Sequence, residues 1–279
     1  MANRSFEFTS PRGYPLSGRL DLPDMPAVGW AVFAHCFTCG KDGLAAARVA
    51  QALARRGIGT LRFDFAGLGA SGGSFADTTF AADTADLVAA GRAMSEAGMP
   101  PALLVGHSLG GAAALAAAVA MPTVRAVATI GAPSNVAHVL HQFDPGSLEE
   151  IRAAGEAEVL LGNRPFVVRR SFLDDVLQHD LEAQVARLHR PLLVLHAPSD
   201  ATVGVENAAR IFTAAKHPKS FISLDGADHL LSRRADADFA AAMIATWVTR
   251  YLPADAPTGD PDLPNVQEEF RGAAADAAG

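Results

Sequence analysis

A serine flanked by small residues carries the most specific chemical signal in this sequence. The stretch VGHSLGG runs from Val105 to Gly111, with an apolar segment before it and an alanine-rich segment after it. Its G-x-S-x-G core is typical of a tight turn between a strand and a helix, where a serine hydroxyl is exposed and its neighbours two residues away must lack bulk. The pattern predicts Ser108 as a nucleophile; the alternative is a serine that only completes a tight turn.

A serine hydroxyl needs a base, and the base needs an acid to orient it. In sites of this kind the three residues follow the order Ser, Asp or Glu, His along the chain. Asp200 follows the apolar run PLLVLH, and His229 follows SFISLDG, so each lies in a loop after an expected strand. We predict that His229 moves protons to and from Ser108 and that Asp200 orients the imidazole. Asp225 and Asp228 are the alternative acids, but both lie on the same short loop as His229.

The two cysteines of the chain, Cys36 and Cys39, lie in a C-x-x-C spacing within WAVFAHCFTCGKDG. A redox pair of this spacing normally begins a helix in a thioredoxin-like unit, which the surrounding sequence does not resemble. A zinc site needs four ligands, mostly nitrogen and sulfur, and the chain has no third cysteine. A thiol-redox protein is therefore the less favoured alternative, and no metal site is predicted.

We interpret this loop instead as part of an oxyanion hole, the set of N–H groups that binds the negative charge developing in acyl transfer. One donor is the residue after the nucleophile, here Leu109, and the other comes from a loop after an early strand. The residue two after His35, which is Phe37, is the expected second donor. Cys36 would then line the substrate pocket beside His35 as an unreactive thiol.

A second glycine motif, GLGASG from Gly67 to Gly72, matches G-x-G-x-x-G after an apolar run. A dinucleotide site requires the last glycine to open a helix, so that the helix N-terminus faces the pyrophosphate. The polar stretch GSFADTT follows here instead, which favours a tight loop at the edge of the pocket. We predict no organic cofactor.

The hydrophobic pattern predicts the elements that must position these residues. Two alternating runs, SFEFTS and LSGRLDLP, flank PRGYP and indicate an antiparallel hairpin. Continuous apolar runs then alternate with helical stretches, which is typical of parallel strands buried on both faces. The expected strands are Trp30–His35, Gly59–Phe65, Ala102–Gly106, Val124–Ile130, Pro191–His196 and Ser220–Leu224. The expected helices are Asp42–Arg56, Thr79–Ala97, Leu109–Met121, Asn207–Ala215 and Ala235–Tyr251.

The interval from Ser134 to Arg190 is far longer than one crossover helix needs. We expect it to form a helical cap over the pocket, at about residues 134–190, with Phe143 and Phe172 lining the substrate site; an elongated crossover is the alternative. Its amphipathic pieces are Val136–Leu140, Leu148–Leu161 and Phe172–Leu188.

These elements predict an α/β fold with a mostly parallel central sheet, an N-terminal antiparallel hairpin and helices on both faces. One domain, which includes the cap, is expected over residues 1–252. Residues 253–279, rich in Pro, Gly, Asp and Ala, should form a mobile acidic tail.

The composition argues against several classes of partner. The chain has 279 residues and a net charge of −7, with no cluster of Lys or Arg to neutralise the phosphates of a nucleic acid. The longest apolar run, GGAAALAAAVAM, is too short to cross a membrane, and MANRSFEFTS lacks the apolar region of a secretory signal. Two cysteines at this spacing cannot staple such a fold, so a reducing cytoplasm is the expected compartment. A homodimer is left open.

From about Ser5 to Leu252 the sequence resembles the α/β-hydrolase superfamily in its elbow, acid loop, histidine loop and DFAGLGAS loop. AHCFTCGKD and RSFLDD look more specifically like the hydrolase portion of bacterial fusion proteins. In those proteins a serine hydrolase precedes an osmotically inducible, peroxiredoxin-like domain that reduces organic hydroperoxides. The resemblance implies Ser108 as nucleophile, with Asp200 and His229 as acid and base. A peroxiredoxin-like partner, if one is needed, is expected to be a separate protein.

We therefore expect a serine hydrolase that cleaves carboxylic esters of small to medium apolar acyl or aryl groups through an acyl-enzyme intermediate. The substrate would be a small-molecule ester, and Leu140, Phe143, Phe166 and Phe172 of the expected cap favour an apolar acyl or aryl group of modest size. A thioesterase and an amidase or aminopeptidase use the same three residues and are the alternatives.

Overall fold

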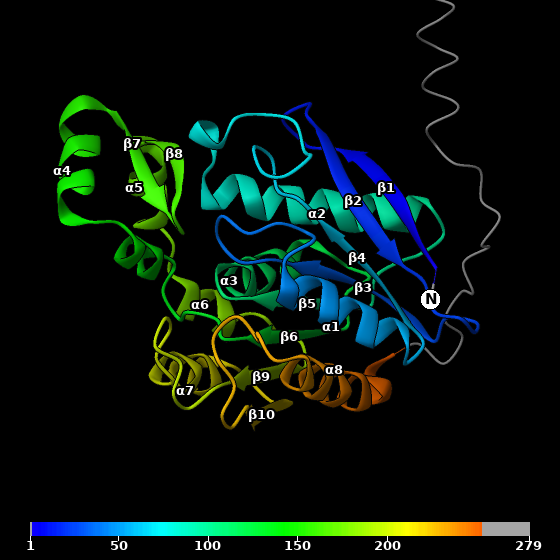
Figure 1. The fold of residues 1–279 in the computed structure, drawn as a ribbon. Coiled ribbons are helices and arrows are strands. Elements are labelled where there is room, and N and C mark those ends of the chain that lie inside the picture. The colour runs from blue at the N-terminus through cyan, green and yellow to red at the C-terminus, as the bar shows by residue number, and fades with distance from the viewer. Residues whose placement is uncertain (1, 253–279) are drawn as a thin grey trace, which may run out of the picture.

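The computed structural model describes residues 2–252, which form an eight-stranded sheet with helices on both faces (Figure 1). The predicted acidic tail at residues 253–279 lies outside the described residues. The strand order is β1-β2-β4-β3-β5-β6-β9-β10, where β1 pairs antiparallel with β2 and β2 with β4, and every other pair is parallel. The predicted fold class is confirmed. The strands are β1 (Asn3–Thr9), β2 (Pro15–Asp21), β3 (Gly29–Ala34), β4 (Ile58–Phe63), β5 (Leu103–His107), β6 (Ala126–Ile130), β9 (Leu192–His196) and β10 (Lys219–Ser223).

Helices connect the parallel strands and cover both faces of the sheet. They are α1 (Leu44–Ala54), α2 (Phe80–Glu96), α3 (Leu109–Ala117), α7 (Glu206–Ala214) and α8 (Arg234–Val248). The start of α2 is capped by Thr79, whose hydroxyl accepts a hydrogen bond from the amide of Ala82. Within residues 2–252 no helix is long and apolar enough to cross a membrane.

The residues of β3 show why an apolar run marks a central strand. Trp30 and Val32 belong to one hydrophobic core, and Ala31 and Phe33 belong to the other. The first core includes residues of α2 and α3, and the second includes residues of α1 and α8. Because both faces are buried, β3 has no polar face to show in the sequence.

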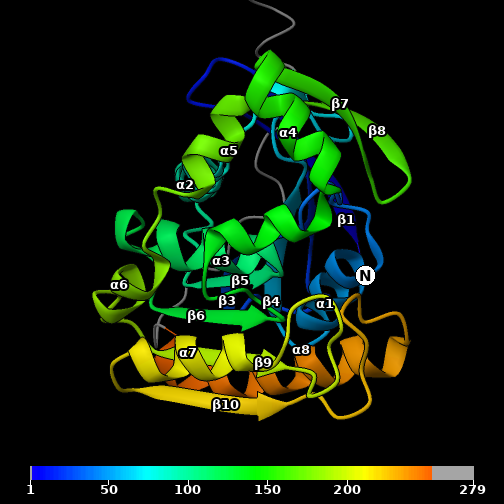
Figure 2. The ribbon, with the colours of Figure 1, turned by 90° about the vertical axis from the view of Figure 1, so that its left-hand side faces the viewer.

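The segment from residue 134 to residue 190, which we call the inserted segment, contains a β-hairpin as well as helices (Figure 2). Its strands β7 (Glu156–Leu161) and β8 (Arg164–Arg169) pair antiparallel, so the amphipathic piece over Leu148–Leu161 is helical only in its first part. Gly162 and Asn163 form the turn with φ of 57° and 62°, as a two-residue hairpin loop requires. The other elements are the 3₁₀ segment η3 (Val136–Gln142) and the helices α4 (Pro145–Ala154), α5 (Arg170–Val176) and α6 (Leu181–Ala186).

Candidate active site

Ser108 lies on a tight turn between β5 and α3, with a backbone φ of 55° and ψ of −127°. A non-glycine residue rarely adopts a positive φ, and such strain is typical of a nucleophile elbow. The backbone segments around this turn pack so closely that Gly106 and Gly110, the residues two before and two after Ser108, have no room for a Cβ atom. A Cβ on Gly106 would lie 2.3 Å from the carbonyl oxygen of Gly110, and one on Gly110 would lie 2.3 Å from that of His35. The sequence motif therefore reflects backbone packing at the elbow.

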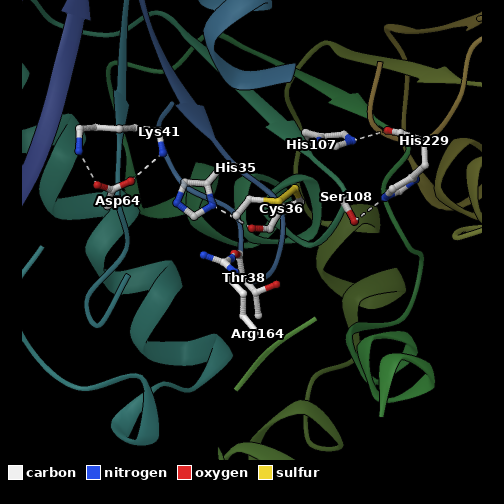
Figure 3. Close-up of a disulfide and its surroundings, with 10 residues drawn as sticks. His35, Cys36, Thr38, Lys41, Asp64, His107, Ser108, Arg164 and His229 are labelled. Atoms are coloured by element: carbon white, nitrogen blue, oxygen red, sulfur yellow. Dashed lines mark hydrogen bonds and ion pairs between the residues drawn. A yellow bond between two sulfur atoms is a disulfide. The ribbon is translucent and has the colours of Figure 1, made fainter. Parts of the chain in front are cut away.

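Three side chains that are distant in sequence meet at this turn. His229 Nε2 lies 3.0 Å from Ser108 Oγ (Figure 3), and His229 Nδ1 lies 2.7 Å from Asp200 Oδ2. Asp200 follows β9 and His229 follows β10, so two neighbouring parallel strands deliver them to the sheet edge where β5 delivers Ser108. In this arrangement the imidazole can take the serine proton at Nε2 while Nδ1–H stays bonded to the carboxylate.

The Asp200 carboxylate is held by more than the histidine. Its Oδ1 accepts hydrogen bonds of 2.9 Å from the amides of Thr202 and Val203. Burial raises the pKa of this carboxyl, but the hydrogen bonds from His229 and from the two amides outweigh that effect, so the pKa lies below its ordinary value. Asp200 is therefore ionised at neutral pH, as an acid that orients a histidine must be.

The two alternative acids bind elsewhere. Asp225 Oδ1 accepts a hydrogen bond of 2.5 Å from Ser223 Oγ, and Asp228 Oδ1 accepts one of 2.8 Å from the amide of Ser232. The hydrogen bonds of the His229 ring within the described residues go to Asp200 and Ser108. Across residues 2–252 no group of three or more His, Cys, Asp or Glu side chains could hold a metal ion.

Two main-chain amides beside the site, those of Phe37 and Leu109, have no acceptor within the described part of the chain. Leu109 is the first residue of α3, where an N–H has no intrahelical partner. Phe37 lies in the loop after β3, and both residues line one small cavity. Both amides are therefore free to donate to a substrate oxygen, as the predicted oxyanion hole requires.

This cavity is narrow, at about 10 Å³, and its wall is mostly aromatic and aliphatic. Of the predicted pocket residues, His35 and Cys36 line it, whereas Phe143 and Phe172 do not. They contact Phe37 instead: its ring stacks on that of Phe172, with centroids 5.2 Å apart, and lies 6.3 Å from that of Phe143. A larger cavity of about 650 Å³ opens at the opposite edge of the sheet. The side chains of Ser108, Asp200 and His229 line neither cavity, but the small one adjoins them through Leu109, the residue after Ser108.

Cys36 and Cys39 are joined by a disulfide, so the prediction of a free thiol at Cys36 is wrong. The amide of Cys39 donates a hydrogen bond of 3.1 Å to the Cys36 carbonyl, and this turn brings the two Cα atoms to 5.3 Å, within disulfide range. The C-x-x-C spacing is the sequence signal that could have predicted this disulfide, since a four-residue turn places the two side chains together. The disulfide also removes the argument for a reducing compartment that rested on cysteine usage.

Comparison with known proteins decides the family. The model of the family described as "Alpha/beta hydrolase family" matches residues 31–242, from β3 into α8. The chain belongs to the alpha/beta hydrolase family. This hydrolase is 48% identical to the esterase domain of a Rhodothermus marinus protein, whose crystal structure superposes with a TM-score of 0.74 over 91% of this chain and 100% of that one. The resemblance seen in the sequence is thus confirmed for the family, whereas a fusion with a peroxiredoxin-like domain is not shown.

A more distant relative is the mouse (Mus musculus) protein named palmitoyl-protein thioesterase ABHD10, mitochondrial. The hydrolase is 25% identical to its sequence over 212 residues, which span 74% of this chain and 70% of that protein. The solved structure of alpha/beta hydrolase domain-containing protein 10 from mouse is 22% identical, with a TM-score of 0.70 over 88% of this chain and 99% of that one. At this identity the structural likeness shows the fold alone.

Proposed function

We propose that this hydrolase cleaves carboxylic esters of small to medium apolar acyl or aryl groups through an acyl-enzyme intermediate. The observation that carries the proposal is the continuous chain of hydrogen bonds from Ser108 through His229 to Asp200. It lies beside the unpaired amides of Phe37 and Leu109. A nucleophile, a base, an orienting acid and oxyanion donors are together the parts that acyl transfer requires.

In the first half-reaction, Ser108 Oγ attacks the ester carbonyl carbon while His229 Nε2 takes the hydroxyl proton. The carbonyl oxygen becomes an oxyanion, to which the amides of Phe37 and Leu109 donate. One such donor contributes about 2.7–4 kcal/mol of transition-state stabilisation. The bond to the alcohol oxygen then breaks, and the alcohol leaves with the proton from His229, so that Ser108 remains as an acyl ester.

The second half-reaction repeats these steps with water. His229 takes a proton from water as the oxygen attacks the acyl carbon, and it returns that proton to Ser108 Oγ when the carboxylic acid leaves. Asp200 stays ionised throughout, and its charge stabilises the imidazolium that forms in each half.

Aromatic side chains favour an apolar acyl or aryl group where they surround the loop between β3 and α1, residues 35–43, which we call the oxyanion loop. Phe143 and Phe172, from the inserted segment, are buried against Phe37. His138 Nε2, at the start of the same segment, donates a hydrogen bond of 2.9 Å to the carbonyl of Thr202 in the acid loop. We therefore propose the inserted segment as the cap over this site.

A panel of p-nitrophenyl esters with acyl chains from acetyl to palmitoyl tests the proposal in the wild-type chain and in Ser108→Ala. We expect the wild type to turn over the short and medium esters and to be labelled at Ser108 by a fluorophosphonate. The Ser108→Ala variant should keep the fold and lose both properties. Equal turnover by the two proteins would refute the assignment of the nucleophile.

A thioesterase is the second candidate, because the mouse relative is named a palmitoyl-protein thioesterase. An ester and a thioester give the same acyl-enzyme, so the three residues do not separate them. Values of kcat/KM for matched octanoyl ester, thioester and amide substrates decide, and the amide covers the amidase or aminopeptidase alternative. A clear preference for the thioester would favour this second candidate.

A further inference from the structure

The peptide bond between Cys36 and Phe37 carries one proposed oxyanion donor, and its orientation is held from the carbonyl side. The Cys36 carbonyl oxygen accepts a hydrogen bond of 2.8 Å from His35 Nδ1 and one of 3.1 Å from the amide of Cys39. In a planar trans peptide the C=O and N–H groups point in opposite directions. Because this carbonyl is held, the Phe37 N–H points away from the turn. On that side no acceptor within the described residues accepts a hydrogen bond from it.

The disulfide closes the turn that makes the second of these hydrogen bonds. Within the turn Thr38 has a φ of 57°, although it is β-branched. A residue of this type rarely adopts that conformation, which persists only where the surrounding structure holds it. The Cys36–Cys39 bond is the covalent part of that restraint.

A second restraint comes from the inserted segment. Arg164, the first residue of β8, donates a hydrogen bond to the carbonyl oxygen of Thr38 (Figure 3). Its guanidinium group also lies 5.2 Å from the ring centroid of Phe166, which helps to fix its position. Farther along the loop, Lys41 pairs with the buried carboxylate of Asp64. Opening the disulfide would thus loosen the turn while the end of the loop stays anchored.

We propose that the Cys36–Cys39 disulfide and Arg164 position the Phe37 amide, so that hydrolysis is fast when the disulfide is formed and slow when it is reduced. This inference rests on the function proposed above. Reduction requires two electrons, which a dithiol supplies. Its thiolate attacks one sulfur of the disulfide, the other sulfur leaves as a thiolate, and the second thiol of the reagent then displaces the first sulfur to close its own disulfide. Cys39 is the more exposed of the two cysteines and offers the accessible end.

The test compares the full chain before and after reduction, with p-nitrophenyl acetate as substrate. Dithiothreitol is removed under argon before the assay, because it attacks this ester, and a chromogenic thiol reagent verifies two free thiols per chain. We expect kcat to fall about 10- to 100-fold, since loss of a whole oxyanion donor costs about 10²–10³. The KM should change much less, and glutathione disulfide should restore kcat. An unchanged kcat in chains with both thiols titrated, or a loss confined to KM, would overturn the proposal.

The variant Cys36→Ala/Cys39→Ala is the matched control. It should have the low kcat of the reduced protein and should not respond to dithiothreitol. An alkyl trifluoromethyl ketone, which forms an oxyanion on Ser108, should bind it more weakly by the same factor as kcat/KM falls. Undiminished binding of this ketone would contradict a role in the oxyanion hole. Circular dichroism checks the fold, and if the variant is unfolded the reduced wild-type chain decides.

Arg164→Ala tests the second restraint with the disulfide intact. We expect kcat to fall about 3- to 10-fold, as for loss of one hydrogen bond. Arg164→Lys keeps a donor for the Thr38 carbonyl and should recover most of kcat, whereas wild-type kcat in Arg164→Ala would remove Arg164 from the proposal.

Lack of Ser108-dependent turnover in the oxidised wild type would refute the proposed function itself. Ser108-dependent turnover that ignores the disulfide would refute only the positioning role.

Discussion

His107 Nε2 lies 2.7 Å from the main-chain carbonyl oxygen of His229, so the residue before Ser108 holds the loop that carries His229. The pKa of His107 is lowered to about 4, first by burial of its imidazole and then by the neighbouring His229. The ring is therefore neutral at assay pH and donates its Nε2–H to the carbonyl. This hydrogen bond thus helps to hold His229 beside Ser108.

Substitution of His107 tests this relationship. His107→Ala leaves the His229 carbonyl without its donor, which should lower the free energy of unfolding by about 1–3 kcal/mol. A less well placed base should also lower kcat roughly tenfold with little change in KM. His107→Gln keeps a donor and should lose less of both. Urea unfolding and p-nitrophenyl ester kinetics measure the two effects, and equal losses in the Ala and Gln variants would contradict the role of the hydrogen bond.

Asp200→Asn should lower kcat by about 10⁴-fold, by analogy with serine proteases, because the amide favours the wrong tautomer of His229. Asp225→Asn makes the same chemical change on the loop of His229, at a carboxylate that binds Ser223. This control should keep the wild-type kcat. The reverse pattern, with the large loss in Asp225→Asn, would transfer the acid role to Asp225.

That the loops after β5 and β9 meet at one edge of the sheet could be predicted, because both strands are buried along their whole length. Buried parallel strands appear as apolar runs, and their carboxyl ends share one edge of the sheet. Ser108 and Asp200 each follow such a run, whereas His229 follows β10, an edge strand that is only partly buried, and is placed by the order of the three residues along the chain. Their hydrogen bonds could not be predicted, since those distances depend on loop conformations that the pattern does not specify.

The β7–β8 hairpin was harder to predict because α4 precedes it directly, and the whole of Leu148–Leu161 is compatible with one amphipathic helix. Buried residues in β7 alternate, and Gly162–Asn163 is the turn signal that the helical interpretation overlooks. The contact from Arg164 to Thr38 joins residues 126 positions apart. No local pattern encodes such a contact, because it depends on where the hairpin packs against the oxyanion loop.

Phe172→Ala should change the acyl-chain preference, because Phe172 is 1% exposed and its ring stacks on Phe37. Removing it leaves a cavity beside the oxyanion loop, at a stability cost of about 3–5 kcal/mol. We expect the chain length with the highest kcat/KM to move to longer p-nitrophenyl esters. Phe8→Ala, in the N-terminal hairpin, removes another buried ring and should destabilise the protein without moving that optimum. An unchanged optimum in Phe172→Ala would place the acyl group elsewhere.

Asp83, in α2, is a buried acid on the wall of the cavity that Phe37 and Leu109 line. Burial and the charge of Asp86 raise its pKa from 3.8 to about 8. A hydrogen bond from Thr78 and the charge of Arg12 oppose the rise only in part. Between these two values the folded chain keeps a proton that the unfolded chain has lost. The stability that this proton gives the folded chain is therefore fully present below pH 3.8. It decreases as the pH rises from 3.8 and is lost once the pH has passed about 8.

Asp83→Asn removes this titration while keeping the shape of the protonated carboxyl. From pH 5 to pH 7, the free energy of unfolding of the wild type should fall relative to that of the variant by about 1.4 kcal/mol per pH unit, because one proton separates the folded and unfolded states. Urea unfolding of both proteins at each pH measures the difference. Asp86→Asn, which removes the neighbouring charge, should lower the pKa of Asp83 and end the decline at a lower pH. A difference between wild type and Asp83→Asn that stays constant over this range would show that Asp83 holds no proton in the folded chain.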